Sequence, residues 1–206
     1  MIIAIDGLGV NGKSTLAKMI ADELGFKCFN SGAIYRCIAL EAVRMNINLE
    51  DIDTIISKVQ DIIIDFDGAK VILNGEDVSK AIRTEEISVK STKLGNSLKI
   101  KSFVKRIQTA FVEKYDTVIE GRDMCTRVVP NADVKFYLYS DFETRVSRLW
   151  NSNPNIDINQ IRENLIKRDK YDIEGGNFIK PVNAIEIDTT NLSLEEVFQT
   201  MMKHIK

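Results

Sequence analysis

The feature that most constrains this chain is a glycine-rich run at residues 7–14, GLGVNGKS, which fits the spacing G-x-x-x-x-G-K-[ST] at every fixed position. The segment before it, Ile2–Ile5, is apolar, and the segment after it repeats apolar residues at helical spacing as far as Leu24. Gly25 then stands where a helix-ending glycine belongs. A buried strand that turns through glycines into a helix predicts an α/β fold.

The chemistry of such a run suits a polyphosphate. Glycines let successive backbone N–H groups face one anion, and the start of the helix adds a partial positive charge. Lys13 is expected to reach the β- and γ-phosphates of ATP, and the Ser14 hydroxyl to be a ligand of Mg²⁺. An ordinary glycine turn capped by Ser14 is the alternative, which the full motif and its context disfavour. The residues expected to bind ATP are Gly7, Leu8, Gly9, Val10, Asn11, Gly12, Lys13, Ser14 and Thr15.

The rest of the chain continues the alternation of strands and helices, which implies a parallel sheet with helices on its faces. The strands expected after the first are Phe26–Phe29, Thr117–Ile119, Val134–Tyr139 and Ala184–Ile187. The helices expected are Ala33–Met45, Lys99–Lys114, one opened by a capping box at Ser140–Glu143 and ending near Trp150, one from Ile156 to about Lys167, and one capped by Ser193–Glu196. The middle of the chain breaks this pattern, because the runs Asp61–Phe66 and Lys70–Leu73 surround a hairpin signal at Asp67-Gly68.

Composition and residue usage limit the function. A chain of 206 residues with 44% hydrophobic content is expected to fold as one domain. The net charge of −2 argues against binding a nucleic-acid polymer through bulk charge. Three cysteines without a C-x-x-C spacing disfavour a disulfide framework or a zinc site, and His204 as the only histidine nearly excludes Ser–His and Cys–His catalysis. No apolar run is long enough for a membrane helix, so a cytoplasmic protein is expected.

A phosphotransferase needs a second anion site, and two motifs at expected strand ends are candidates for it. The first runs from Ser31 to Arg36 after the second strand, and the second is Glu120-Gly121-Arg122-Asp123. Arginine can hold a phosphate through two parallel hydrogen bonds, so Arg36 and Arg122 are candidates for that task. Asp123 could accept hydrogen bonds from the amino group of a base. The alternatives are a solvated helix arginine for Arg36 and a surface ion pair for Arg122 and Asp123.

These motifs resemble those of the bacterial cytidylate kinases, in the nucleoside-monophosphate kinase group, over nearly the whole chain. The matching motifs are the glycine-rich run, Ser31–Arg36, Gly75–Ser79, Ile82–Glu85, Gly121–Met124, Arg168-Asp169 with Asp172, and Asp188–Thr190. The resemblance implies a single three-layer P-loop kinase domain over residues 1–206, with a five-stranded parallel sheet. It also implies a small β-containing insertion that binds the nucleoside monophosphate, at 60–98, and a lid at 168–181.

The resemblance also implies roles for individual residues. Arg36 and Arg122 are expected to hold the phosphate of the acceptor, Ser31 and Asp123 to read cytosine, and Arg168 and Asp172 to contact the nucleotide from the lid. Lys101 stands where the family has an arginine, and Thr92 stands where the family has a serine that contacts the ribose. Both residues belong to the expected acceptor site. We therefore expect Mg²⁺-dependent transfer of a phosphoryl group from ATP to CMP or dCMP by a monomer, with Lys13, Arg122 and Arg168 as the catalytic residues. Asp6 is a weaker candidate, either for orienting metal-bound water or as a turn aspartate.

The chain departs from the family pattern most in the lid, where no arginine follows Arg168 before Pro181. An arginine in this position can be worth 10³–10⁵ in rate, by analogy with arginine fingers. Arg168 together with Lys167, Lys170 and Lys180 could take over. Two other interpretations stay open: a P-loop kinase acting on another small phosphorylated acceptor, and a nucleotide-binding protein with weakened catalysis.

Overall fold

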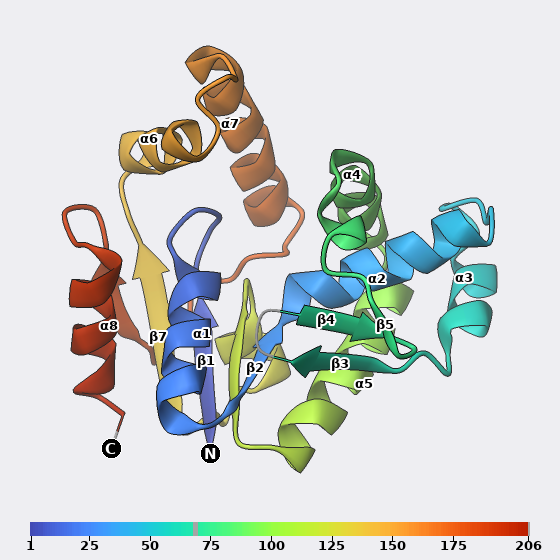
Figure 1. Ribbon diagram of the computed structural model, residues 1–206, viewed down its shortest axis with the longest axis horizontal. Coiled ribbons are helices and arrows are strands. Elements are labelled where there is room, and N and C mark those ends of the chain that lie inside the picture. The colour runs from blue at the N-terminus through green and yellow to red at the C-terminus, as the bar shows by residue number, and fades with distance from the viewer. Residues whose placement is uncertain (68–69, 206) are drawn as a thin grey trace. The chain divides into compact units, whose positions relative to one another are not determined.

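The computed structural model describes residues 1–67 and 70–205. The chain divides into two compact units, one formed by Met1–Phe26 with Thr117–Lys206 and the other by Lys27–Asp116 (Figure 1). The first unit contains the glycine-rich run, and the second contains the predicted insertion.

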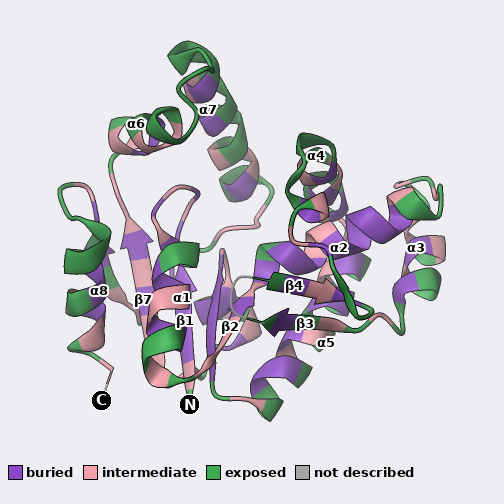
Figure 2. Ribbon diagram, viewed as in Figure 1, coloured by how far each residue is buried: buried purple, intermediate pink, exposed green. Residues whose placement is uncertain are grey.

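The central sheet is parallel and has five strands in the order β2-β6-β1-β7-β8, as expected for the α/β class. In the first unit, β1 (Ile2–Asp6) pairs with β6 (Thr117–Gly121) on one side and with β7 (Val134–Tyr139) on the other. The strand β8 (Ile185–Asp188) continues the sheet beyond β7. Strands of a parallel sheet are buried on both faces by helices, so they are apolar along their length, and this is why apolar runs predicted them. Figure 2 shows that β1 is largely buried.

The helices of the first unit begin and end at signals that the sequence carries. The helix α1 (Lys13–Leu24) ends at Gly25 in the left-handed conformation, with φ of 69°, as predicted. The last helix, α8 (Leu194–Met202), begins with the predicted capping box, in which Ser193 and Glu196 bond each other's backbone N–H groups. The helix α6 (Phe142–Ser152) is also confirmed.

The capping box predicted at Ser140 is wrong. The N-cap of α6 is Asp141, whose Oδ1 accepts from the backbone N–H of Thr144 at 2.7 Å. The Ser140 hydroxyl donates instead to Oδ1 of Asn11 in the glycine-rich loop, at 2.6 Å. A long-range bond to the loop therefore replaces the local bond that the spacing favours, and it joins the end of β7 to residues 7–12.

The helix α7 (Ile158–Glu174) runs further than the predicted end near Lys167. It packs on α6 through the buried side chains Val146, Ile161 and Leu165. The residues after Lys167 contain no helix breaker until Gly175, so the helix continues through the charged stretch. The first half of the segment predicted as a lid, 168–181, is thus the end of α7, and its role as a lid stays a prediction.

The second unit starts with β2 (Lys27–Asn30) and contains a small antiparallel sheet in the order β3-β4-β5. The strand β3 (Ile64–Asp67) pairs antiparallel with β4 (Lys70–Leu73), as the hairpin signal predicted. The strand β5 (Glu76–Asp77) pairs antiparallel with β4. The predicted turn residue Gly68 lies outside the described residues. The rings of Phe29, Phe66 and Phe111 pack with centroids 4.6–5.9 Å apart and form the centre of this unit.

The remaining elements of the second unit are helical. They are α2 (Ser31–Arg44), α3 (Ile52–Val59), the short 3₁₀ turn η1 (Ala81–Arg83), α4 (Glu85–Leu94) and α5 (Leu98–Lys114). The helices α2 and α5 confirm predictions, whereas α3 and α4 were not predicted. Each of these two short helices begins at a side-chain N-cap, Asp51 and Thr84, and this cap is the signal that could have located it.

Among the helices that the structure describes, none combines the length and apolar character needed to span a membrane.

Candidate functional site

The glycine-rich loop connects the buried end of β1 to the first turn of α1. A side chain at Gly7 is impossible, because a Cβ there would lie 2.2 Å from the carbonyl oxygen of Leu138 on β7. Gly12 precedes α1 with φ of 77°, a conformation that glycine adopts without strain. These two glycines hold the loop against the sheet and turn it into the helix, so that its backbone N–H groups are available to an anion.

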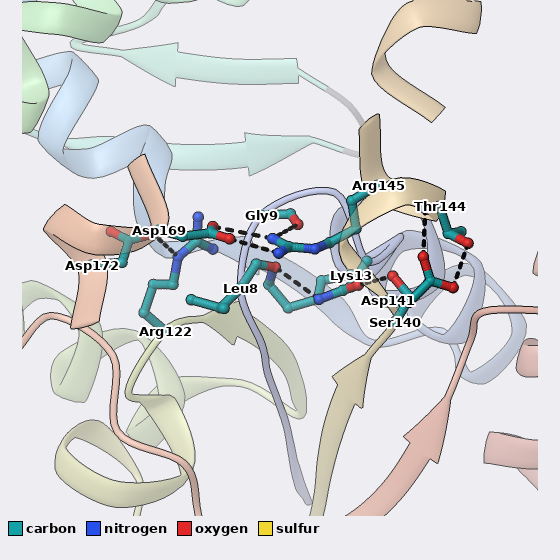
Figure 3. A network of polar contacts seen from close by, with 11 residues as sticks. Leu8, Gly9, Lys13, Arg122, Ser140, Asp141, Thr144, Arg145, Asp169 and Asp172 are labelled. Atoms are coloured by element: carbon teal, nitrogen blue, oxygen red, sulfur yellow. Dashed lines mark hydrogen bonds and ion pairs between the residues drawn. The ribbon is translucent and has the colours of Figure 1, made fainter. Parts of the chain in front are cut away.

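Lys13 lies beneath this loop with its side chain buried, and its Nζ donates to the carbonyl oxygen of Leu8 at 2.8 Å (Figure 3). Burial lowers the pKa of Lys13 from its ordinary value to about 7. The positive charges of Arg122 and Arg168 contribute to this lowering of the pKa, and the carboxylate of Glu120 opposes it. A buried ammonium group next to two guanidinium groups is costly without an anion, and this cost is what a bound phosphate would relieve.

Arg122 and Arg168 approach the loop at Gly9. A Cβ at Gly9 would lie 3.5 Å from Nη2 of Arg122 and 3.6 Å from Cζ of Arg168. Arg122 follows β6 and Arg168 is on α7, so three separate elements bring the residues predicted to be catalytic to one loop. The arrangement combines three cationic side chains with a helix N-terminus, and it can bind and neutralise a polyphosphate.

The first turn of α1 carries the oxygen groups that suit Mg²⁺. The hydroxyl of Ser14 donates to Oε1 of Glu120, at the end of β6, with 2.8 Å between the oxygens. Hydroxyl and carboxylate oxygens are the ligands that Mg²⁺ takes in proteins, so these two residues fit the metal of a phosphoryl-transfer site. Thr15, the next residue, is exposed. Sequence reasoning gave Glu120 no role, although its position directly after two buried strand residues was the signal.

Asp6, at the end of β1, is fully buried, and both of its carboxylate oxygens are engaged by backbone. They accept from the N–H groups of Met124 and Cys125 at 2.9 and 2.8 Å. Burial raises the pKa of Asp6 to about 6, and these two hydrogen bonds oppose the shift. The geometry supports the turn-aspartate interpretation, because Asp6 anchors the π-helical turn η2 (Met124–Val128) that follows Arg122 and Asp123.

Four residues predicted for the acceptor site lie in this unit: Arg122, Asp123, Arg168 and Asp172. Nε of Arg122 donates to Oδ2 of Asp172 at 2.7 Å, and its Nη1 donates to the carbonyl oxygen of Gly7 at 3.3 Å. Asp172 is largely buried in the last turn of α7, so this ion pair connects α7 to the phosphate loop. Oδ2 of Asp123 lies 3.5 Å from Nη1 of Arg127.

Arg145, on α6, is a residue that sequence reasoning missed. It is buried and forms a two-point ion pair with Asp169 on α7, at 3.1 and 2.6 Å, and its Nη1 also donates to the carbonyl oxygen of Gly9 at 3.4 Å (Figure 3). Its Nε is buried with no hydrogen-bond partner among the described residues. Nothing in the local sequence distinguishes Arg145 from a surface arginine, because its partners are far away along the chain.

The other predicted acceptor residues, Ser31, Arg36, Thr92 and Lys101, belong to the second unit. Ser31 opens α2, is buried, and its hydroxyl accepts from Nε2 of Gln108 on α5 at 2.7 Å. Arg36 is half-buried on α2, and Lys101 is half-buried in the first turn of α5. Thr92 is exposed on α4, where its hydroxyl donates to the carbonyl oxygen of Ser88 at 2.9 Å. Their roles toward a substrate stay predictions.

This chain is similar to known proteins along almost its whole length. The family model described as cytidylate kinase matches residues 3–206. A cytidylate kinase of Bacillus thuringiensis (strain Al Hakam) is 36% identical over 210 residues, covering 97% of this chain and 93% of that protein, and one of Bacillus cereus (strain AH187) gives the same values.

Among solved structures, a shikimate kinase from Bacteroides thetaiotaomicron has a TM-score of 0.53 at 8% identity, covering 100% of this chain and 98% of that chain. TT1252 from Thermus thermophilus has a TM-score of 0.52 at 15% identity, with the same coverage of each chain. At such low identity these two structures show a shared fold and nothing more. The match of the family model to almost every residue, together with relatives at 36% identity over the same length, shows that this chain belongs to the cytidylate kinase family.

Proposed function

We propose that this chain transfers the γ-phosphoryl group of ATP to CMP and dCMP, forming CDP and dCDP, with Mg²⁺ and as a cytoplasmic monomer. The observation that carries the proposal is the convergence of Lys13, Arg122 and Arg168 on the phosphate loop. Membership of the cytidylate kinase family, whose relatives bear that name, supports cytidine nucleotides as the acceptors.

Catalysis in this proposal consists of positioning and charge neutralisation, without a covalent intermediate. The loop N–H groups hold the phosphates of ATP, and Lys13 and Arg168 stabilise the charge that moves with the phosphoryl group. Ser14 and Glu120 would hold Mg²⁺, which when bound neutralises charge on the β- and γ-phosphates. The remaining residues of the loop, from Gly7 to Thr15, complete the ATP site.

The acceptor is recognised in two parts. Arg36 and Arg122 hold its phosphate, and Arg122 must then exchange the Asp172 carboxylate for that phosphate. Ser31, Lys101 and Asp123 read the base, and Thr92 contacts the ribose. A cytosine ring presents an amino group that Asp123 can accept from, whereas uracil presents a carbonyl oxygen in the same place, so a carboxylate there favours cytosine.

An acceptor panel tests the proposal. The purified full chain with ATP and Mg²⁺ is assayed for ADP release with CMP, dCMP, UMP, AMP, GMP and a set of other small phosphorylated or hydroxylated metabolites. The expected result is turnover that is largest with CMP or dCMP. Similar rates for all nucleotides, or turnover only with a non-cytidine compound, would contradict the proposed acceptor. ATP binding with no transfer to any compound would indicate a protein that has lost catalysis.

Replacing Asp123 by alanine is expected mainly to relax base choice. A base donor left without an acceptor costs about 1–3 kcal/mol, so kcat/KM for CMP should fall by roughly 5- to 160-fold while that for UMP changes little. Steady-state kinetics with both acceptors measures the ratio. Asp22→Ala, which removes an exposed carboxylate paired with Lys18 on α1, is the matched control. An unchanged CMP-to-UMP ratio in Asp123→Ala would show that Asp123 does not read the base.

A further inference from the structure

Arg127 is a cation that the proposed reaction has not used. It lies on η2, four residues after Asp123, and its Nη1 donates to the carbonyl oxygen of Gly176 at 2.6 Å. The same nitrogen lies 3.5 Å from Oδ2 of Asp123. One guanidinium group therefore contacts both the proposed base reader and the segment predicted to be the lid.

The element that carries Arg127 is held firmly at its base. The N–H groups of Met124 and Cys125, the first two residues of η2, donate to the buried carboxylate of Asp6. The N–H of Arg127 itself donates to the carbonyl oxygen of Asp123 at 2.8 Å. Asp123 and Arg127 are thus fixed relative to each other by the backbone, and the long side chain of Arg127 extends from η2 to the predicted lid.

The contact on the lid side is at the turn that ends α7. Gly176 has φ of 63°, and the N–H groups of Asn177 and Phe178 both donate to the carbonyl oxygen of Asp172, at 2.9 and 2.8 Å. The turn is therefore built around the backbone of Asp172, whose side chain pairs with Arg122. Arg122 holds this segment by a carboxylate, and Arg127 holds it by a main-chain carbonyl four residues later.

The two contacts differ once the acceptor binds. In the proposed function the acceptor phosphate takes the guanidinium group of Arg122, and the carboxylate of Asp172 then loses its partner. The proposed function assigns no substrate group to Arg127, so its bond to the carbonyl oxygen of Gly176 can persist. Two lysines of the predicted lid form ion pairs with carboxylates close to them in sequence. Lys170 pairs with Glu174 at 3.9 Å, and Lys180 pairs with Glu186 at 2.8 Å.

We propose that Arg127 is a positioning residue that holds the end of the lid against η2 and orients Asp123, in a lid that has no arginine after Arg168. This inference rests on the proposed function. It assigns to a residue outside the lid part of the work that the lid sequence leaves unfilled. Because Arg127 acts on the acceptor side, its loss should weaken use of the acceptor and leave the ATP site intact.

The test uses Arg127→Met, which keeps the length of the side chain and removes its charge, and Arg127→Lys, which keeps a donor for the Gly176 carbonyl. The matched control is Arg162→Met, which removes another arginine with an ion pair, to Glu143 at 2.8 Å, from the start of α7. The KM for CMP, the KM for ATP, kcat and the CMP-to-UMP ratio of kcat/KM are measured on the full chain. Thermal unfolding checks that each variant is folded.

In Arg127→Met the KM for CMP is expected to rise about tenfold and the CMP-to-UMP ratio to fall, while the KM for ATP stays within about twofold. Arg127→Lys should recover most of the loss, and Arg162→Met should behave as wild type. An unchanged KM for CMP in Arg127→Met, an equal rise in the KM for ATP, or no recovery in a folded Arg127→Lys would overturn the inference. If the wild type itself does not use CMP or dCMP, the proposed function is wrong. If the wild type uses CMP and Arg127→Met has the same kinetics, only the inference about Arg127 is wrong.

Discussion

Replacing Lys13 by methionine is expected to lower kcat for phosphoryl transfer by at least about 10²- to 10³-fold, and to make the ligand-free protein more stable. The loss of rate follows because Lys13 is the cation beneath the phosphate loop, and removing one preorganised charge-stabilising donor has effects of this size. The gain in stability follows because the same ammonium group is buried near Arg122 and Arg168 and is poorly solvated. We therefore expect Lys13 to stabilise the transition state of the proposed reaction and to destabilise the ligand-free fold.

The lowered pKa of Lys13 predicts how its contribution to the free energy of unfolding changes with pH. In the unfolded chain Lys13 has its ordinary pKa of 10.5, and in the folded protein the pKa is about 7. Below pH 7 the lysine is charged in both states, and folding carries the full cost of burying the charge, on the order of 5 kcal/mol. Between pH 7 and 10.5 the unfolded chain binds more protons than the folded one, so the contribution of Lys13 to stability rises with pH. Above pH 10.5 the lysine is neutral in both states and the cost is gone.

Urea unfolding of wild type and Lys13→Met at pH 6.5 and at pH 9.5 measures this effect. At pH 6.5 the variant should be more stable than wild type by roughly 2–4 kcal/mol. This gain is smaller than the full cost of burying the charge, because the variant leaves the carbonyl oxygen of Leu8 without its hydrogen-bond donor. The advantage should shrink at pH 9.5. Lys18→Met, on the exposed face of the same helix and paired with Asp22, is the control and should change neither kcat nor the pH dependence. A Lys13→Met protein that is less stable than wild type at pH 6.5 would contradict this account of the buried ammonium group.

The phosphate loop could be predicted from the sequence because each of its requirements is local. The backbone geometry of the loop requires glycine at positions 7 and 12, and the spacing of the motif identifies Lys13 and Ser14. The periodicity of apolar residues predicts the strand before the loop and the helix after it. The same holds for the end of α1 at Gly25. In each case the physical cause lies within a few residues, so that the pattern in the sequence and the structure coincide.

Other features have causes that lie far away along the chain. Ser140 has the spacing of a capping residue, yet its hydroxyl bonds Asn11, 129 positions away. Arg145 meets Asp169 across two helices, and the sequence gives no sign of that pairing. Asp6 was a candidate for metal chemistry because it ends a strand beside the phosphate loop, but its oxygens are engaged by the backbone of η2. Local patterns could predict where polar groups gather, and only the tertiary structure shows which of them pair.

The small number of arginines in the predicted lid, residues 168–181, leads to the second prediction with a large effect. Arg168 is the only arginine in the segment 168–181, and its guanidinium group lies at Gly9 of the phosphate loop. It is held there by α7, which is anchored on both sides by the pairs of Asp169 with Arg145 and of Asp172 with Arg122. Lys170 and Lys180 of the same segment pair with Glu174 and Glu186, so we expect Arg168 to supply most of the positive charge that the predicted lid brings to the moving phosphoryl group.

Arg168→Met is therefore expected to reduce kcat by about 10³-fold, comparable to the loss of an arginine finger, with a much smaller effect on the KM for CMP. Arg168→Lys keeps the charge but loses the planar fork, and should recover only part of the rate. Arg162→Met, on the same helix, is the control and should retain wild-type kcat. Single-turnover measurements with ATP and CMP separate the chemical step from product release. A fall of less than about tenfold in the chemical step of Arg168→Met would contradict the proposed role of Arg168 in stabilising the moving phosphoryl group.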